Sequence, residues 1–456
     1  MGIGSPLAGT RNIWPPVSFE GGEPIDEIKD LPVLIQLRLL DQKDPSTKLW
    51  CATGVCPVDP ASKIKKSESF PSLVWICSGT HSVSEIMVIN ASSANHVMDQ
   101  FVIANAHVLC VTSVPAFNLD SLEAQESEDE ESIDYNMKGA TVWLGAQEGS
   151  LFVHSAFTSW RNCLQKIQLK DSIHSITHVN DRVIATMGDG TLAIFSRKTD
   201  RNWDLENPKV VDLGRPQQTI RCSVAVLNEV WCGYRNRIYV VEPRTAKIKK
   251  WFETTTRPES QVRHLATAGE GVWVSVRLDS TLRLFHAETG QLLQEVELDP
   301  FIQKMFGFVN LGFFMTKVSS MAVFCNRLWV GTASGLILSF PFSSGLCSES
   351  TAKESEPERG PYCSLEHAQV SFHGHRDAVK FFACVPACIN TSSLGGEGKN
   401  TGNFNMLVMS GGEGYINFRI GDETGDTCED YGELLMANPR SRKSERSHLI
   451  VWQLQI

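Results

Sequence analysis

The chain has 456 residues, of which 42% are hydrophobic, and its formal net charge is −10. This charge argues against a nucleic-acid-binding protein, because such proteins need a basic surface that displaces counterions from phosphates. No apolar run approaches the roughly 18 residues that a membrane-spanning helix requires. The length fits two or three ordinary domains, or one long repeat fold.

Thirteen cysteines are scattered singly along the chain, and no two of them form a Cys-x-x-Cys pair. The count is odd and many of these cysteines lie inside apolar runs, so we predict free thiols in a reducing compartment. The start of the chain shows no charged segment followed by an apolar one, which predicts no signal peptide. These features together favour a cytoplasmic protein.

The two ends of the chain differ in composition. Residues 1–30 are rich in Gly and Pro and are predicted to form a flexible lead-in. The apolar segment LPVLIQLRLL begins at Leu31, and the chain ends with HLIVWQLQI from His448. A ring of sheets closes only if its first and last sheets meet, so we expect these two segments to take part in closing one domain over residues 31–456.

A short phrase returns along the chain: an apolar run, often with Trp, then a turn with small residues, then a second apolar run. The seven copies begin at Val74, Val142, Val183, Val230, Val272, Leu328 and Leu407. Each copy predicts a β-hairpin, so one hairpin unit is stacked seven times.

The spacing of these copies indicates the fold. Val142 and Val183 are 41 residues apart, Val183 and Val230 are 47 apart, and Val230 and Val272 are 42 apart. Four-stranded propeller blades repeat about every 40–45 residues. We therefore predict an all-β, WD-repeat-like β-propeller with seven blades, or eight if residues 31–54 form part of an extra one.

One blade can be predicted in full. SIHSITHV from Ser172 is the inner strand, and RVIATM and TLAIFSR form the central hairpin. The hairpin turns at Gly188-Asp189-Gly190, residues that supply the backbone freedom of a tight turn. VVDLG from Val210 is the outer strand.

Polar insertions interrupt the repeat. They lie near residues 118–138, 343–361, 390–405 and 421–447. All contain few aliphatic residues and are predicted to be mobile, because they cannot offset the entropy of ordering. The first is an acidic run, which is either a solvated spacer or a substrate for a kinase at Ser127.

Two groups of aromatic residues stand out. The repeat tryptophans occupy one recurring position and predict packing between blades; they are Trp75, Trp143, Trp231, Trp273 and Trp329. The segment PFIQKMFGFVNLGFFM from Pro300 is either tucked onto the propeller or exposed for docking. Our hypothesis is that Phe306, Phe308 and Phe313 contribute to partner binding.

Catalytic and metal-binding motifs are not found in the sequence. There is no GxSxG, GxxxxGK[ST] or HExxH motif and no kinase signature. The irregular spacing of Cys363, His373, Cys384 and Cys388 does not predict a zinc site. Gly374-His375 resembles the Gly-His pair of WD repeats, whose His forms a hydrogen bond within the blade. We therefore predict no catalytic residue, no metal and no cofactor.

Several long phrases resemble one known family. They include LPVLIQLRLLDQKDPSTKLWCATG, VWCGYRNRIYVV, GVWVSVRLDSTLRLFHAETG and LVMSGGEGYINFRIGDE. These phrases are similar to the carboxy-terminal WD-like propeller region of the c-Jun N-terminal kinase-interacting scaffold proteins of the Sunday driver type. The resemblance covers nearly everything from Leu31 to the end.

The resemblance implies a non-enzymatic scaffold and adaptor. Such proteins gather members of a mitogen-activated kinase cascade and link vesicles or lysosomes to kinesin and dynein. The family's kinase-docking and motor-binding segments lie in amino-terminal helical and coiled-coil regions, and this chain has no sustained heptads. It is thus expected to be a fragment or short product that carries only the propeller, and no family binding residue can be carried over.

Two alternatives stay open from the sequence. A related propeller ends certain Rho guanine-nucleotide exchange factors, which have similar VWxG and SGGxGY phrases. A propeller enzyme would instead need carboxylates or histidines from several blades at a central channel. Inner strands such as SIHSITHV and SSMAVF carry few acids.

Overall fold

The structure is a computed structural model in which the chain divides into two compact units. It describes residues 31–40, 47–56, 71–92, 97–116, 139–199, 202–215, 217–306, 316–343, 361–387, 405–418 and 446–455. The larger unit comprises Gln42–Leu298 and Ala383–Cys388, and the smaller unit comprises Met1–Asp41, Asp299–Phe382 and Ile389–Ile456. The predicted insertions lie almost entirely outside the described residues, as does the predicted lead-in.

The larger unit consists of five four-stranded antiparallel sheets, each formed by four consecutive strands. The strands of the first three sheets are β2 (Lys48–Val55), β3 (Leu73–Gly79), β4 (Val83–Asn90) and β5 (Val97–Ala104); β6 (Val108–Val114), β7 (Thr141–Ala146), β8 (Ser150–Ser155) and β9 (Cys163–Gln168); and β10 (Ile173–Val179), β11 (Arg182–Met187), β12 (Thr191–Arg197) and β13 (Trp203–Asp212).

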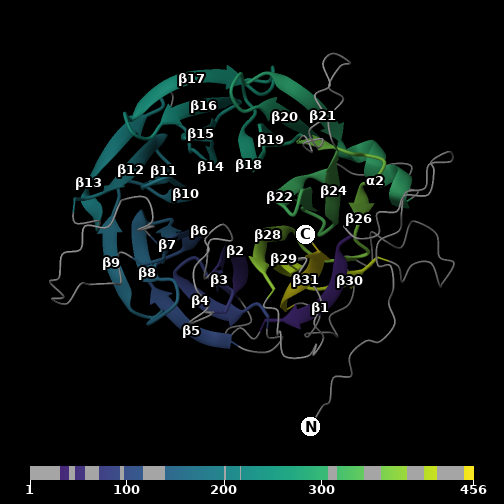
Figure 1. Ribbon diagram of the computed structural model, residues 1–456, viewed down its shortest axis with the longest axis horizontal. Coiled ribbons are helices and arrows are strands. Elements are labelled where there is room, and N and C mark those ends of the chain that lie inside the picture. Colours follow the sequence, from purple (N-terminus) through teal and green to yellow (C-terminus); the bar gives the residue numbers. More distant parts are fainter. Residues whose placement is uncertain are drawn as a thin grey trace, which may run out of the picture. The chain divides into compact units, whose positions relative to one another are not determined.

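The strands of the last two sheets are β14 (Cys222–Val226), β15 (Glu229–Tyr234), β16 (Arg237–Glu242) and β17 (Lys247–Glu253); and β18 (Val262–Ala268), β19 (Gly271–Val276), β20 (Thr281–His286) and β21 (Leu292–Glu297). Within this unit, Figure 1 shows β10, β14 and β18 on the inner side of their sheets and β13, β17 and β21 on the outer side.

The predicted blade is confirmed, with a longer outer strand. The carboxylate of Asp189 accepts hydrogen bonds from the backbone N–H and the hydroxyl of Thr191, at 3.0 and 2.6 Å. Gly190 has φ of 85° and completes the turn between β11 and β12. Strand β13 begins at Trp203, earlier than predicted, because the Trp203 ring packs edge-on against Trp143 at 5.3 Å between ring centroids.

The five repeat tryptophans are fully buried, which confirms their predicted packing role. Trp143 on β7 contacts Phe195 on β12 of the next sheet, with 5.7 Å between ring centroids. The side chains of neighbouring sheets therefore form shared cores. Burying rings of this size is the main favourable term that holds one sheet against the next.

The smaller unit contains two larger sheets, a short two-stranded sheet and one helix. The first sheet has the order β1 (Val33–Leu39), β31 (Ser447–Gln455), β29 (Asn405–Glu413) and β28 (Val379–Pro386). The second joins β22 (Val318–Phe324), β23 (Arg327–Thr332) and β24 (Ile337–Ser343), with β25 (Tyr362–Cys363) and β26 (Gln369–Val370) both paired to β24. Strands β27 (His373–Gly374) and β30 (Ile416–Asn417) pair with each other, and the helix is α2 (Leu298–Phe306).

The two apolar end segments of the described chain pair as predicted. Strand β31 lies between β1 and β29, and its register with β1 runs from Val33 opposite Gln453 to Leu39 opposite His448. The eight-blade alternative is wrong, because β1 joins this sheet while β2 opens a different one. Five sheets of the larger unit and two of the smaller unit give the seven predicted blades.

The hairpin predicted from Leu407 is wrong. The strand that follows β29 is the short β30, which pairs with β27 instead of β29. Both edges of β29 are already used, by β28 and β31. Gly414, with φ of 64°, turns the chain out of the sheet.

In the part of the chain that the structure describes, no helix is long and apolar enough to cross a membrane.

Candidate functional site

The first strands of the larger unit share a feature at the edge where they begin. In a four-stranded antiparallel sheet, the first strand begins, the second ends, the third begins and the fourth ends at one edge, which we call the leading edge. Connections at this edge bring residues from different strands of one sheet together. Figure 1 shows β10, β14 and β18 on the inner side of their sheets. Residues near the starts of these first strands are therefore candidates for a common site.

Four of these first strands begin with a β-bulge. In β10, for example, Ile173 pairs with Met187 and Ser175 pairs with Thr186, which leaves His174 without a partner. The same shift occurs at the start of β2, β6 and β18. Bulges bend a strand and re-aim one side chain, and they are enriched beside functional sites.

Four bulge residues, and Arg221 at the equivalent place, occupy this position in the five sheets. In chain order the residues are Trp50, Leu109, His174, Arg221 and Arg263. Arg221 stands directly before β14, after the fully buried Ile220, and so occupies the equivalent place. Each of the five follows a fully buried aliphatic residue yet is itself at least partly exposed.

Three successive sheets therefore present cationic or imidazole side chains. We call His174, Arg221, Arg263 and Arg277 the arginine cluster. Arg277 follows the end of β19, and its backbone N–H donates to the carbonyl of Gln261 at 2.7 Å, next to the start of β18. Topology alone thus places the four residues at the leading edges of adjacent sheets.

Hydrogen bonds between sheets fix this arrangement. The Ser223 hydroxyl lies 2.6 Å from that of Thr177 and 3.0 Å from that of Ser175, which ties β14 to β10. The Val262 N–H donates to the Arg235 carbonyl at 2.7 Å, which ties the start of β18 to the preceding sheet.

His174 forms part of a hydrogen-bonded chain. Arg221 Nη1 lies 3.4 Å from His174 Nδ1, which must accept because a guanidinium only donates. His174 Nε2 lies 3.0 Å from the Ser172 hydroxyl, which donates in turn to Asp171 at 3.1 Å. Burial and the charge of Arg221 lower the pKa of His174 to about 4, so the ring is neutral at pH 7.

The positive charges of the cluster act on one another. Burial lowers the pKa of Arg263, and the charges of Arg221 and Arg277 lower it further. Burial, followed by the charge of Arg277, likewise lowers the pKa of Arg221. Among the described residues, none of these three arginines forms an ion pair with a carboxylate within 4.0 Å.

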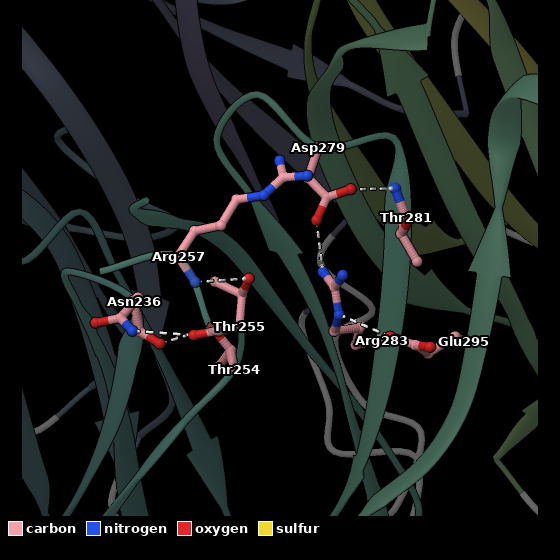
Figure 2. Close-up of polar contacts among 8 residues, drawn as sticks. All are labelled: Asn236, Thr254, Thr255, Arg257, Asp279, Thr281, Arg283 and Glu295. Carbon is pink, nitrogen blue, oxygen red and sulfur yellow. Dashed lines mark hydrogen bonds and ion pairs between the residues drawn. The ribbon is translucent and has the colours of Figure 1, made fainter. Parts of the chain in front are cut away.

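Nearby acids at this edge already have partners. Figure 2 shows Asp279, two residues after Arg277, accepting from the Thr281 N–H at 3.0 Å and from Arg283 at 2.8 Å. Arg283 also donates to Glu295 at 2.9 Å. In the preceding sheet, the Thr254 hydroxyl donates to the Asn236 carbonyl at 2.9 Å. Among the described residues, Asp279 forms its ion pair with Arg283 and with no arginine of the cluster.

Trp50, at the bulge position of the first sheet, packs against a histidine and is not part of the arginine cluster. The Trp50 indole N–H donates to the Gly79 carbonyl at 3.3 Å, and its ring meets His107 edge-on at 4.4 Å between centroids. His107 Nδ1 lies 2.7 Å from Gln147 Oε1.

Within the described residues, no group of three or more His, Cys, Asp or Glu side chains is placed to hold a metal ion.

The predicted partner-binding phenylalanines cannot be placed. Phe306 is the last residue of α2, whose Leu298 and Ile302 are fully buried and whose Phe301 ring contacts Phe340 at 5.5 Å between centroids. Phe308 and Phe313 lie outside the described residues, as does the side chain of Phe306. Their role stays a prediction.

The Gly-His pair forms the expected bond. His375 is fully buried, and its Nε2 lies 2.9 Å from the Ser410 hydroxyl on β29. Burial lowers its pKa to about 3, which makes it a neutral structural residue. The sequence also offered nearby residues for a zinc site. His373 Nδ1 lies 2.5 Å from the Tyr415 hydroxyl, and burial raises the pKa of the Cys363 thiol. Cys388 lies outside the described residues.

The sequence-based reasoning missed the arginine cluster. The repeat in the sequence is the central hairpin of each blade, whereas His174, Arg221 and Arg263 lie at the strands before the hairpins. Aligning the first strands as SIHSI, TIRCS and QVRHL would have placed the cationic residues at one position. The bulges of β10 and β18 re-aim the residue at that position, which the sequence pattern alone does not show.

Comparisons with known proteins agree with this architecture. The WD40 repeated domain family matches residues 42–346. C-Jun-amino-terminal kinase-interacting protein 4 from Homo sapiens is 34% identical over 658 aligned positions, covering 95% of this chain and 50% of that protein. C-Jun-amino-terminal kinase-interacting protein 3 from Rattus norvegicus is 33% identical, with 96% and 50% covered. JNK-interacting protein 3 from Drosophila melanogaster is 40% identical over 331 positions, which cover 72% of this chain and 26% of that protein.

The alignment with the human relative is longer than the 456 residues of this chain, so the relative carries additional residues within the matched region. This chain spans about half the length of these mammalian relatives. Rho guanine nucleotide exchange factor 17 from Homo sapiens is more distant, at 26% identity over 72% of this chain. The repeated sheets, the buried tryptophans and the matched region lead to one conclusion: the chain belongs to the WD40-repeat family, and it is similar over nearly its whole length to the JNK-interacting proteins.

Proposed function

We propose that this chain is the non-catalytic protein-interaction propeller of a signalling scaffold. In this proposal the scaffold assembles members of the c-Jun N-terminal kinase cascade and links vesicle cargo to kinesin and dynein motors. The observation that carries it is the similarity, over 95% of the chain, to a protein named as interacting with c-Jun-amino-terminal kinase. The protein works in the cytoplasm and reaches vesicles or lysosomes through its partners.

The non-catalytic reading has its own support. The bulge positions that face a shared edge carry Trp, Leu, His and Arg, and no acid. General acid–base chemistry usually needs paired groups with opposing pKa shifts within reach of one substrate. A row of guanidinium groups instead suits recognition of a charged partner.

Affinity capture tests this function. The purified chain, immobilised and incubated with cell lysate, should enrich kinases of this cascade or motor subunits and their adaptors over an unrelated WD40 propeller. Recovery of such partners by the full-length human relative in parallel, with none on this chain, would contradict autonomous binding by the propeller. Enrichment of Rho-type GTPases instead would favour the alternative function as the regulatory propeller of an exchange factor, which the distant similarity supports.

We propose further that Phe306, Phe308 and Phe313 contribute to partner binding. Helix α2 is anchored by the buried Leu298 and Ile302, and Phe306 stands at its far end. Aromatic residues dominate binding energy at protein interfaces. Replacing any one of them with Asp should weaken capture by roughly tenfold or more while leaving the melting temperature unchanged.

The control for this prediction is Ile302→Asp on the same helix. Ile302 is fully buried, so its charged replacement should lower the melting temperature sharply. If the phenylalanine variants unfold as readily as Ile302→Asp does, the three side chains belong to the core and the docking hypothesis is wrong.

A further inference from the structure

We propose that the arginine cluster binds a phosphorylated serine or threonine side chain of a partner protein. The inference rests on the proposed protein-interaction function and names the chemistry that this edge would recognise. It is carried by the convergence of three guanidinium groups and one imidazole, contributed by three successive sheets. His174 and Arg263 occupy bulge positions, Arg221 directly precedes β14 and Arg277 directly follows β19, and all four are at least partly exposed.

The arginine cluster carries an excess of positive charge that a bound anion would balance. Arg221, Arg263 and Arg277 repel one another and have no carboxylate partner among the described residues. Asp171, the one acid that acts on His174, is bound by the backbone N–H and hydroxyl of Ser172. An anion between the guanidinium groups would replace repulsion with charge-assisted hydrogen bonds.

A phosphate monoester fits this arrangement better than a carboxylate. It carries a charge of about −1.5 to −2 and three acceptor oxygens, whereas a carboxylate carries one charge and two oxygens. Each guanidinium presents donors in a planar fork that matches phosphate geometry. A phosphate therefore has enough acceptor oxygens for donors from all three arginines.

The setting of the cluster favours a peptide over a membrane or a nucleic acid. His174 and Arg263 are partly buried, so a side chain that projects from a peptide can reach them more readily than a flat bilayer surface can. The net charge of −10 opposes approach to any extended polyanion. Trp50 and Leu109, at the equivalent positions of two preceding sheets, offer apolar contacts for residues beside the phosphate.

The acidic run of this chain is a poor candidate for the ligand. That run falls between β6 and β7, where the chain leaves one strand and enters the next at the edge opposite the leading edge. The cluster lies at the leading edges. We therefore assign the anion to a second protein.

The test measures binding of fluorescein-labelled peptide pools to the full chain by fluorescence polarisation. One pool carries a central phosphoserine, a second carries serine and a third carries glutamate. The phosphoserine pool should bind at least tenfold more tightly than the serine pool, and binding should weaken as salt is raised. Arg221→Ala and Arg263→Ala should each reduce affinity by roughly tenfold or more.

Two controls keep the test decisive. Arg161→Ala removes an exposed arginine between β8 and β9, at the opposite edge, and should bind like the unaltered chain. Arg263→Lys keeps the charge but loses the fork, and it should bind less tightly than the unaltered chain while melting at the same temperature. It therefore reports on recognition even if Arg263→Ala fails to fold.

Three results would overturn the proposal. The first is equal binding of the phosphoserine and serine pools, and the second is equal binding of the glutamate pool, which would indicate a general acidic ligand. The third is binding to phosphatidylserine vesicles without binding to any peptide, which would indicate a membrane. If the phosphoserine and serine pools bind equally while the chain still captures partners from lysate, the scaffold function stands and only the phosphate inference fails.

Discussion

At the scale of the residue, glycine positions show how closely the strands approach. Gly335 has φ of 84°, and a Cβ there would lie 1.7 Å from the carbonyl oxygen of His375. Gly269 also has positive φ, of 51°, but open space around it. We predict that Gly335→Ala lowers the free energy of unfolding by about 3 kcal/mol or more, because clash adds to backbone strain. Gly269→Ala should cost only about 1 kcal/mol.

Urea denaturation of both variants checks this difference. Gly269→Ala serves as the matched control, since it has the strained conformation without the clash. Equal losses of stability in the two variants would show that the neighbouring backbone at Gly335 gives way, and that the close approach to His375 is not a constraint on the fold.

At the scale of the element, strand β31 holds its sheet together because it lies between β1 and β29. It buries Leu449, Ile450, Val451 and Trp452, and the Trp452 ring meets Trp329 at 5.4 Å between centroids. Burying each such aliphatic side chain contributes about 1.5–3 kcal/mol, and a typical net stability is only roughly 5–15 kcal/mol, so losing several of these side chains together is enough to unfold the sheet. Removing residues 447–456 should therefore unfold the sheet and lower solubility, as measured by circular dichroism and sedimentation.

A synthetic peptide of residues 447–456 provides the control for this truncation. Added in excess to the truncated chain, it should restore the melting transition by pairing with β1 and β29, whereas a peptide of scrambled order should not. A truncated chain that melts like the full one would show that β31 is dispensable.

At the scale of the whole molecule, the charge distribution is uneven. The chain has a net charge of −10, yet three arginines meet at the leading edges of adjacent sheets. A local positive site on a negative protein attracts small or projecting anions and repels extended polyanions, since surface charges are screened beyond about 10 Å at 0.1 M salt. This contrast links the proposed phosphate site to a scaffold that would recognise modified partners.

The sequence by itself determined the β-hairpin repeat, the buried tryptophans and the pairing of the two apolar end segments. The first two depend on local patterns of hydrophobic spacing and turn residues, and the third follows from the requirement that the first and last sheets of a ring meet. Gly188, Asp189 and Gly190, for example, form the turn between β11 and β12 that the sequence pattern predicts.

Only the tertiary structure decided the fate of the seventh repeat and the location of the arginine cluster. After Leu407 the local pattern again favoured a hairpin, but β31 arrives from the distant end of the chain and occupies the edge of β29. Likewise, His174, Arg221 and Arg263 are separated by more than 40 residues each and converge because stacked sheets bring their first strands together. Competition for a strand edge and convergence across sheets are properties of contacts between distant segments, which no local pattern specifies.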